Sequence, residues 1–396
     1  MDVRQYKEQR VRQINEPLPS TGPKFDPAAP APHLTIFTRD PHKFSETFVR
    51  RRIQHLNGGN VSVVSLTGTG DGSCLEKPEF STRKVRRWER ILTSRQAQRR
   101  QHVLDFLARQ GTTHVVFEFG YVATEFADLL PHLTIPAYCT FRGNDASAQL
   151  RDPAYVTTLT QCFGDLDGII TVSDFLRRNL ASVGLHHPRT LVAPSGVDTT
   201  LFTPGTPTRG LCFNVGRLVP KKQPLPMIRA FAEVAEAHDL TLEIAGEGPL
   251  EKSARALVSS LGMEQRIRFL GRLDHAAVRE RMRSAMIYLQ NFETPPDGDT
   301  EGMPTVIQEA MACGVPIVTT RHSGVPEHVV DGITGRVVEP GDVDGLAGAL
   351  AALAAAPDQR ASIARNARAH AVAELDYRAL FRRIETFMGL RAEDAV

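Results

Sequence analysis

The chain has 396 residues, of which 41% are hydrophobic, and its formal net charge is +2. This length exceeds what one hydrophobic core usually serves, so two domains are expected, and the near-balanced charge argues against a dedicated nucleic-acid binder. Five scattered cysteines without CxxC spacing argue against a disulfide framework or a zinc site and favour a reducing cytoplasm. No apolar run reaches the roughly 18 residues of a membrane span, and the charged N-terminus does not resemble an export signal.

The first half of the chain alternates strand and helix patterns. Residues 1–32 contain six prolines and few periodic apolar positions, so we expect a flexible leader. Ser45 is a suitable cap for the helix that follows the first strand. Strands are expected at 34–37, 61–66, 115–119, 137–141, 168–172 and 190–193. Such alternation predicts a parallel, doubly wound sheet.

Two stretches of this half admit a second interpretation. The run LTGTGDG (66–72) resembles a Gly-rich phosphate loop, but no amphipathic helix follows it, so we interpret it as a plain loop. Residues 83–109 hold nine Arg and Lys against two acids. We interpret them as a solvated helix face. The alternative is a surface that contacts anionic lipid, helped by Trp88 and Ile91.

The second half repeats the pattern after a Pro/Gly-rich linker, 203–210. Its strands are expected at 211–215, 241–245, 267–270, 286–289, 316–319 and 335–338, with helices at 223–238 and 250–261. The sequence therefore predicts the α/β fold class with two Rossmann-like doubly wound domains facing across a cleft, and ligands at the carboxyl ends of the strands. The expected domains are 33–205 and 206–376, followed by an amphipathic C-terminal helix within 377–396.

The stretch EGMPTVIQEAMACGVPIV (301–318) places Glu301 and Glu309 eight positions apart. Pro304 suits the first turn of a helix and Gly314 suits its end, so we expect a helix over 304–313. The free N–H groups at its start would attract an anion between the two acids. A nucleotide-sugar fits that layout, although an ordinary helix with solvated acids remains the alternative.

Further candidates follow other strands of the second half. Arg217 and Lys222, in GRLVPKKQ, could neutralise a departing diphosphate without a metal. Gly246 in GEGP could let the backbone approach a ligand closely, and Gly271-Arg272 could form an edge for a base. The acids of DGD (297–299) are interpreted as a solvated loop rather than a metal-binding DxD, and HSGVPE (322–327) is expected to reach the cleft.

In the first half, Glu118, Arg142 and Asp145 follow strands. They are the polar groups expected to face the opposite domain, with turn or cap roles as the alternative.

In these motifs the chain resembles the family-4 retaining glycosyltransferases of the GT-B fold. GRLVPKK, GEGP, FLGRL, EGMPTVIQEAMACGVPIV and PSGVDTTLF stand in family order. The run DGDTEGMP…HSGVPE and the N-terminal SETFVRRRIQHL are similar to transferases that assemble exopolysaccharides of the colanic-acid and amylovoran type.

The resemblance implies a role for each matching position. Arg217 and Lys222 would hold the donor diphosphate and, with Glu301, act in catalysis. Glu301 would contact the donor sugar and Glu309 the ribose. The remaining donor-binding residues would be Gly216, Gly246, Arg272, Gly302, Met303, Pro304 and Thr305. No metal or cofactor is implied, and the C-terminal helix would return to the first domain.

Glu118 and Arg142 stand where many relatives have histidine. Arg142 stays protonated and cannot act as a general base, but it could bind an anionic sugar or an acceptor phosphate.

The expected partners are a nucleotide-sugar and a glycan or lipid-linked acceptor, in the cytoplasm or at the inner face of the membrane. A small-molecule acceptor and a non-catalytic nucleotide-sugar binder are the alternatives; a dinucleotide enzyme is disfavoured because the third glycine of G-x-G-x-x-G is replaced by Glu251.

Overall fold

A computed structural model describes residues 23, 25–43, 46–67, 75–82 and 95–393. Ser45, Trp88 and Ile91, and most of the expected 66–72 loop, lie outside these residues. The described chain forms two compact units. The N-terminal unit holds the described residues up to Ala193 together with those from Phe381 onward, and the C-terminal unit spans Pro194–Leu380. The boundary at Ala193 precedes the linker expected at 203–210.

The N-terminal unit contains a parallel sheet with the order β3-β2-β1-β4-β5-β6-β7. Leu34 of β1 lies opposite Val61 of β2 on one side and His114 of β4 on the other. The strands are short and mostly buried, as expected for a sheet covered on both faces. Their bounds are β1 Leu34–Thr38, β2 Val61–Ser65, β3 Glu79–Ser81, β4 His114–Glu118, β5 Ala137–Phe141, β6 Gly168–Thr171 and β7 Thr190–Val192.

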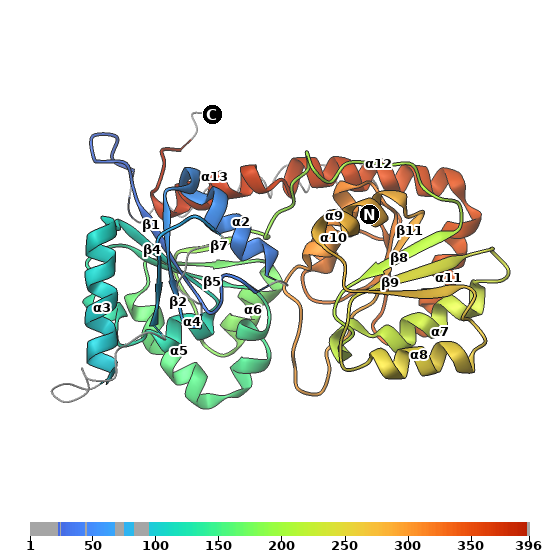
Figure 1. Cartoon of the computed structure of the whole chain (residues 1–396), viewed down its shortest axis with the longest axis horizontal. Helices are drawn as coiled ribbons and strands as arrows, with labels where there is room; N and C mark the ends of the chain where they lie inside the picture. The colour runs from blue at the N-terminus through green and yellow to red at the C-terminus, as the bar shows by residue number, and fades with distance from the viewer. Residues whose placement is uncertain (1–22, 24, 44–45, 68–74, 83–94, 394–396) are drawn as a thin grey trace. The chain divides into compact units, whose positions relative to one another are not determined.

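The helices of this unit are α2 Thr47–His55, α3 Arg95–Gln110, α4 Gly120–Glu125, α5 Pro153–Asp165 and α6 Asp174–Ser182. In Figure 1, α3 borders this sheet, and α4 and α5 lie below it. The end of the chain also packs here. Tyr138 donates a hydrogen bond to the carbonyl oxygen of Met388 (2.9 Å), and Arg189 donates one to that of Phe387 (2.6 Å).

The C-terminal unit contains a second parallel sheet with the order β10-β9-β8-β11-β12-β13. The strands are β8 Leu211–Val215, β9 Thr241–Ala245, β10 Ile267–Gly271, β11 Ile287–Gln290, β12 Ile317–Thr320 and β13 Arg336–Val338. Both sheets thus follow the doubly wound order in which the chain starts near the middle, moves to one edge and then returns to the other side.

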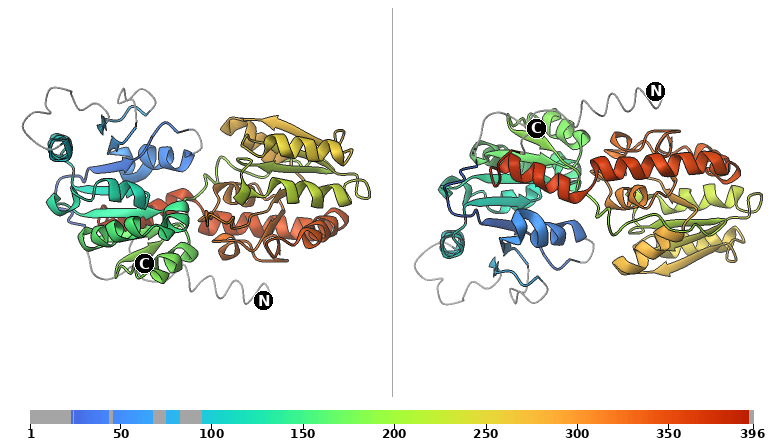
Figure 2. Two further views of the ribbon diagram at one scale, coloured as in Figure 1. Left: turned by 90° about the horizontal axis from the view of Figure 1, so that it is seen from below. Right: turned by 90° about the horizontal axis from the view of Figure 1, so that it is seen from above.

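Helices cover both faces of this second sheet. They are α7 Pro224–Val234, α8 Glu251–Ser260, α9 His275–Ser284, α10 Thr305–Ala312, α11 Val343–Ala355 and α12 Pro357–Glu374. The helices α7, α8 and α11 contribute to one buried cluster, and α9, α10 and α12 contribute to another. Figure 2 shows α7 and α8 in the view from below and α12 in the view from above.

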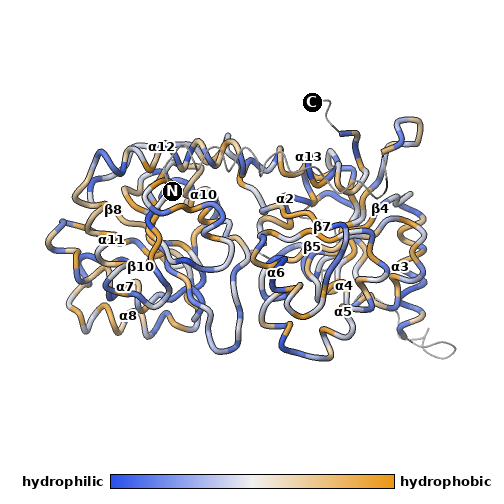
Figure 3. The backbone as a smooth tube through the Cα atoms, turned by 180° about the vertical axis from the view of Figure 1, so that it is seen from behind, coloured by the Kyte–Doolittle hydropathy of each residue, from blue (hydrophilic) through white to orange (hydrophobic). Residues whose placement is uncertain are grey.

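The hydrophobic residues concentrate in the strands and the inward turns of the helices (Figure 3). The last helix, α13 Tyr377–Met388, begins in the C-terminal unit and ends in the N-terminal unit. The described cysteines are all buried and free, and they are Cys139, Cys162, Cys212 and Cys313.

Candidate functional site

The loops that carry most of the candidate residues meet at one point of the C-terminal sheet. The strand order reverses between β8 and β11, and parallel sheets bind ligands beyond the carboxyl ends of the strands at such a point. Arg217 and Lys222 follow β8, and Glu301 lies in the loop between β11 and α10. The topology therefore brings the predicted cations and the first predicted carboxylate to one edge.

Their side chains form a lysine–carboxylate cluster, consisting of Lys221, Lys222, Asp299 and Glu301. The Lys222 Nζ lies 3.2 Å from Glu301 Oε1, and the Lys221 Nζ lies 3.5 Å from the same oxygen. Lys221 also lies 3.0 Å from the Asp299 carboxylate. Lys222 was predicted from its motif and Lys221 was not, although the two are adjacent in VPKKQ. Both point to the carboxylates because they lie on a short 3₁₀ turn, Pro220–Lys222.

The electrostatics of the cluster favour charged side chains. Burial acts to raise the pKa of the Glu301 carboxyl, but Lys222, Lys221 and Arg217 outweigh it and lower that pKa to about 2. Burial lowers the pKa of Lys222, and Glu301 opposes this shift. With Arg217 nearby, three cations face two carboxylates. The site therefore has an excess of positive charge, which suits a bound anion.

Aromatic and amide groups fix the position of the lysines. The Lys222 ammonium lies 4.7 Å from the centre of the Phe292 ring, and the imidazole of His322 stacks against that ring at 5.9 Å. The side-chain amide of Gln290 donates to the carbonyl oxygen of Lys222 (3.3 Å), and the amide of Glu293 donates to that of Lys221 (3.2 Å). The β8 and β11 loops are thereby bonded to each other.

The helix predicted over 304–313 is α10, Thr305–Ala312, which is one residue shorter at each end. Pro304 is its N-cap rather than its first helical residue, and no side chain caps it. Gly314, with φ of +63°, ends it as predicted. Glu301 lies ahead of the helix, whereas Glu309 lies inside it.

Glu309 is buried within α10, and its Oε1 lies 3.8 Å from the Nε2 of His275. The turn from Gly302 to Thr305 is mostly buried. The amide of Gly324 donates to the carbonyl oxygen of Gly302 (2.9 Å), which ties this turn to the loop after β12.

The glycines of GEGP have a packing explanation that differs from the predicted one. A Cβ atom at Gly246, where φ is +123°, would lie 2.0 Å from the carbonyl oxygen of Gly216. A Cβ atom at Gly248 would lie 2.4 Å from the carbonyl oxygen of Leu218. The two loops after β8 and β9 therefore touch along their backbones, and this contact requires glycine at both positions; the donor-binding role of Gly246 stays a prediction. Arg272 follows β10 and is exposed.

The interpretation of DGD as a solvated loop is wrong for Asp299, because this carboxylate belongs to the lysine–carboxylate cluster. Asp297 accepts a hydrogen bond from the amide of Asp299 (3.0 Å) and so shapes the loop. Among the described residues, no group of three or more His, Cys, Asp or Glu side chains is arranged to hold a metal ion.

In the N-terminal unit, Glu118 and Arg142 form a buried ionic group with Arg52. The Glu118 carboxylate accepts from the Arg52 Nη1 at 2.7 Å and from the Arg142 Nη2 at 2.6 Å, and Arg52 also donates to Thr140 (2.8 Å). Burial opposes the charge on Glu118, but Arg142 and Arg52 lower its pKa below the usual range. Glu118 thus has internal partners for both oxygens, and the guanidinium of Arg142 lies over the ring of Phe48 at 4.4 Å.

Asp145 is also fully buried. Its carboxylate accepts from the backbone amides of Gly120 (2.9 Å), Arg142 (3.0 Å) and Gly143 (2.9 Å). These bonds assign Asp145 and Glu118 a structural role, which corrects the expectation that they face a substrate. Arg142 is the residue of the three for which an acceptor role still deserves a test.

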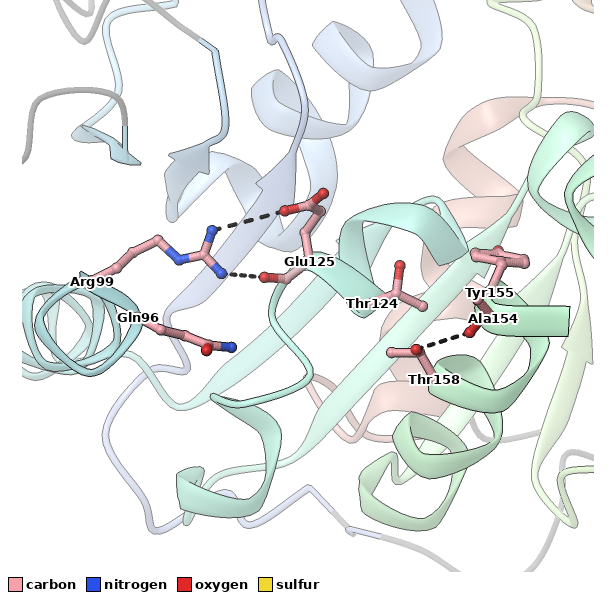
Figure 4. A pocket seen from close by; sticks show the side chains of 7 residues that line it. All are labelled: Gln96, Arg99, Thr124, Glu125, Ala154, Tyr155 and Thr158. Atoms are coloured by element: carbon pink, nitrogen blue, oxygen red, sulfur yellow. Dashed lines mark hydrogen bonds and ion pairs between the residues drawn. The ribbon is translucent and has the colours of Figure 1, made fainter. Parts of the chain in front are cut away.

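A polar pocket also lies in the N-terminal unit, between α3, α4 and α5 (Figure 4). Arg99 donates to the backbone oxygen of Glu125, and its guanidinium also lies 3.9 Å from the Glu125 carboxylate and 3.7 Å from that of Asp128. The pocket is lined by Gln96, Arg99, Thr124, Glu125, Ala154, Tyr155 and Thr158. None of the residues that line it was singled out from the sequence.

Helix α3 is the described part of the basic stretch 83–109. Arg99 and Arg100 lie near Asp128, so part of its positive charge is neutralised within the unit. In the part of the chain that the structure describes, no helix is long and apolar enough to cross a membrane.

Comparison with known proteins decides the family. Residues 204–370 match the family described as glycosyl transferases group 1. A GDP-mannose-dependent alpha-(1-6)-phosphatidylinositol monomannoside mannosyltransferase of Mycolicibacterium smegmatis is 31% identical over 260 residues, which are 61% of this chain and 67% of that protein. The chain belongs to glycosyl transferases group 1.

Other relatives are named for exopolysaccharide synthesis. A putative colanic acid biosynthesis glycosyltransferase, WcaL, of Salmonella typhimurium is 34% identical over 53% of this chain and 53% of its own length. The matched part of the chain spans between 30% and 67% of the length of the curated relatives compared here. The resemblance to exopolysaccharide transferases inferred from the motifs is confirmed.

The fold prediction is also confirmed. The crystal structure of Anabaena Alr3699/HepE in complex with UDP-glucose has a TM-score of 0.74 to this chain, at 19% identity, and covers 89% of this chain and 98% of that one. The two Rossmann-like domains are those of the GT-B fold.

Proposed function

We propose that this protein is a retaining glycosyltransferase that moves a sugar from a nucleoside-diphosphate sugar to a glycan or lipid-linked acceptor. The observation that supports this best is the lysine–carboxylate cluster at the switch point of the C-terminal sheet. Lys222 and Lys221 converge there on Glu301, ahead of the N-terminus of α10. Cations beside a helix N-terminus are suited to a diphosphate, and a carboxylate among them is suited to sugar hydroxyl groups.

The proposed chemistry needs only these charges. The bond between the anomeric carbon and the diphosphate oxygen breaks while Arg217, Lys221 and Lys222 stabilise the negative charge that develops on the leaving group. The acceptor oxygen bonds to the anomeric carbon on the same face, and its proton passes to the leaving diphosphate oxygen. Anomeric configuration is thereby retained, and no metal ion is required.

The remaining donor roles follow the resemblance. Glu301 would contact the transferred sugar, Glu309 the ribose, and the turn Gly302–Thr305 the diphosphate and sugar. Three relatives are named as GDP-mannose-dependent, and a structural neighbour was crystallised with UDP-glucose, so both classes of donor are candidates here. The relatives named for colanic acid and amylovoran synthesis support an acceptor in a cell-surface polysaccharide.

The test is turnover of UDP-glucose and GDP-mannose by the purified chain, followed as release of UDP or GDP with and without saccharide acceptors. Lys222→Ala should lower kcat at least about 100-fold, because a charge that stabilises the leaving group is lost. Lys252→Ala, on the exposed face of α8, is the matched control and should keep full activity. Activity should persist in excess EDTA.

Three results would contradict the proposal. A strict metal requirement would contradict the metal-independent mechanism. An inverted product by NMR would contradict retention. Tight binding of either nucleotide-sugar with no turnover, not even hydrolysis, would instead support a non-catalytic binding protein.

We also propose that the enzyme works in the cytoplasm, and that the basic stretch 83–109 contacts the inner face of the membrane. Co-sedimentation with vesicles containing an anionic lipid should exceed that with neutral vesicles and should fall as salt is raised. Equal sedimentation with both kinds of vesicle would remove the membrane contact from the proposal.

A further inference from the structure

At the carboxyl ends of β11 and β12, three buried side-chain atoms have no hydrogen-bond partner among the residues that the structure describes. They are the Oδ1 of Asn291, the Nε2 of His322 and the Oγ of Ser323. Asn291 and His322 are each only 5% exposed. An unsatisfied buried polar group destabilises a fold, so a group of them at the end of a parallel sheet calls for a ligand that supplies the missing bonds.

The backbone of the same turn is strained. Ser323 has a φ of +50°, a conformation that a side chain with a Cβ rarely adopts. The neighbouring Gly324 donates to the carbonyl oxygen of Gly302, so the strained turn is held against the turn that precedes α10. Strain of this kind persists where the surrounding structure holds it, and it concentrates at functional sites.

His322 is linked to the lysine–carboxylate cluster through the ring of Phe292. Its ring stacks on that of Phe292 with an interplanar angle of 13°, and Phe292 also contacts the Lys222 ammonium. Burial lowers the pKa of His322 to about 4, with Lys222 and Lys221 adding to the effect against the opposing charge of Glu301. The imidazole is therefore neutral near pH 7.

A neutral imidazole and a serine hydroxyl are suited to different ligand groups from those the lysines bind. Lys221, Lys222 and Arg217 supply positive charge for the phosphates. His322 and Ser323 supply uncharged donors and acceptors, which match the hydroxyl groups of a sugar. Asn291 supplies a further acceptor on the adjacent strand end.

We propose that His322 and Ser323 bind hydroxyl groups of the donor's sugar and thereby determine which sugar is transferred. The inference rests on the proposed function, because it names a specificity element of the same donor site. It assigns these residues to the sugar and not to the nucleotide. A substitution at either residue should therefore weaken binding of the nucleotide-sugar and leave the affinity for the free nucleotide nearly unchanged.

The test compares two substitutions at position 322 by calorimetric titration. His322→Phe keeps the stacking on Phe292 and removes the ring nitrogens, whereas His322→Gln restores an amide nitrogen at the same reach. His322→Phe should bind UDP and GDP within about twofold of wild type and should bind the sugar-linked donor, UDP-glucose or GDP-mannose, about tenfold more weakly. His322→Gln should recover most of that loss, which a merely structural role would not produce.

Deoxy-sugar donors identify the hydroxyl concerned. His322→Phe should lose little affinity for the one deoxy donor that lacks its partner hydroxyl, and should lose affinity for the others. Ser323→Ala, which keeps the strained backbone and removes only the hydroxyl, should show the same kind of selectivity for a different position. A Tm for each variant within a few degrees of wild type confirms that the fold is intact.

The outcomes distinguish this inference from the proposed function. If wild type turns over either donor and His322→Phe weakens nucleotide and nucleotide-sugar equally, the specificity role is wrong and the proposed function stands. A uniform loss for every deoxy donor would also overturn it. If wild type neither binds nor turns over UDP-glucose or GDP-mannose, the proposed function fails first, and this inference fails with it.

Discussion

Replacing Glu301 with glutamine removes the negative charge that Lys221 and Lys222 both contact, while it preserves the shape of the side chain. The pKa of this carboxyl is lowered from 4.5 to about 2. At about 1.4 kcal/mol for each pKa unit, that difference corresponds to roughly 3 kcal/mol of favourable interaction for the charged form. The side chain is 19% exposed, so screening reduces the value, and we expect Glu301→Gln to lower the free energy of unfolding by about 1–3 kcal/mol at pH 7.

The pH dependence of this loss has a defined sign. Because the folded-state pKa lies below the unfolded value, the carboxylate stabilises the fold fully above about pH 5. That contribution declines as the pH falls below the unfolded pKa and is lost as it falls through about 2. The difference between wild type and Glu301→Gln should therefore be constant from pH 8 to 6 and should shrink below pH 5.

The assay is urea unfolding of the full chain across this pH range, following the transition that is sensitive to UDP or GDP. Glu339→Gln is the matched control, because Glu339 forms an exposed ion pair with Arg321 in the same unit and should cost only a few tenths of a kcal/mol. Glu301→Gln should also bind UDP or GDP several-fold more tightly, since Lys222 then has no ion pair with residue 301 to compete with the diphosphate. A variant as stable as wild type at pH 7, or one with an unchanged difference at pH 3.5, would refute the reasoning.

Substitutions at three further positions test other features of the fold. Ser323→Gly should raise stability by about 1 kcal/mol, because glycine adopts a positive φ without strain, whereas Ser323→Ala should not; chemical denaturation distinguishes them. Gly246→Ala should destabilise the C-terminal unit by about 1–3 kcal/mol or more, since the new methyl group overlaps the loop after β8; a Tm equal to wild type would show that this contact is loose. Glu118→Gln should cost about 3–5 kcal/mol, because Arg52 and Arg142 would be left buried without a counter-charge; a cost below 1 kcal/mol would contradict the buried ionic group.

Much of the fold follows from local sequence signals. The strands β8 and β9 have the predicted bounds, because apolar runs between turn residues define them sharply. Helix α10 differs from its prediction by one residue at each end, since Pro304 and Gly314 mark its limits. The sequence places Arg217, Lys222 and Glu301 at one edge because each follows a strand, and parallel strands have their carboxyl ends at the same edge.

Other features depend on contacts that the sequence alone does not reveal. Strand β3, Glu79–Ser81, is three residues long and pairs only at the edge of its sheet with β2. Helix α12 was missed because its buried residues are Ile363, Ala367, His370 and Ala371, which form only a weak hydrophobic pattern.

Among the site residues, the structural role of Glu118 depends on Arg52, which lies 66 residues earlier in the chain. No sequence pattern near Glu118 indicates that Arg52 is its partner. His322 was placed within a motif, but its unsatisfied ring nitrogen is visible only once the loops are packed.

The buried cysteines make the protein suited to fluorescence work. Cys139, Cys162, Cys212 and Cys313 are at most 2% exposed, and burial raises the pKa of each thiol, to about 12 for the last three. Such thiols react slowly with maleimides, because the thiolate is the reactive form. Once Cys74 is replaced by serine, a dye pair can be attached at cysteines introduced for exposed residues on α5 and α8. Energy transfer between those dyes would then follow the separation of the two units as UDP-glucose or GDP-mannose binds.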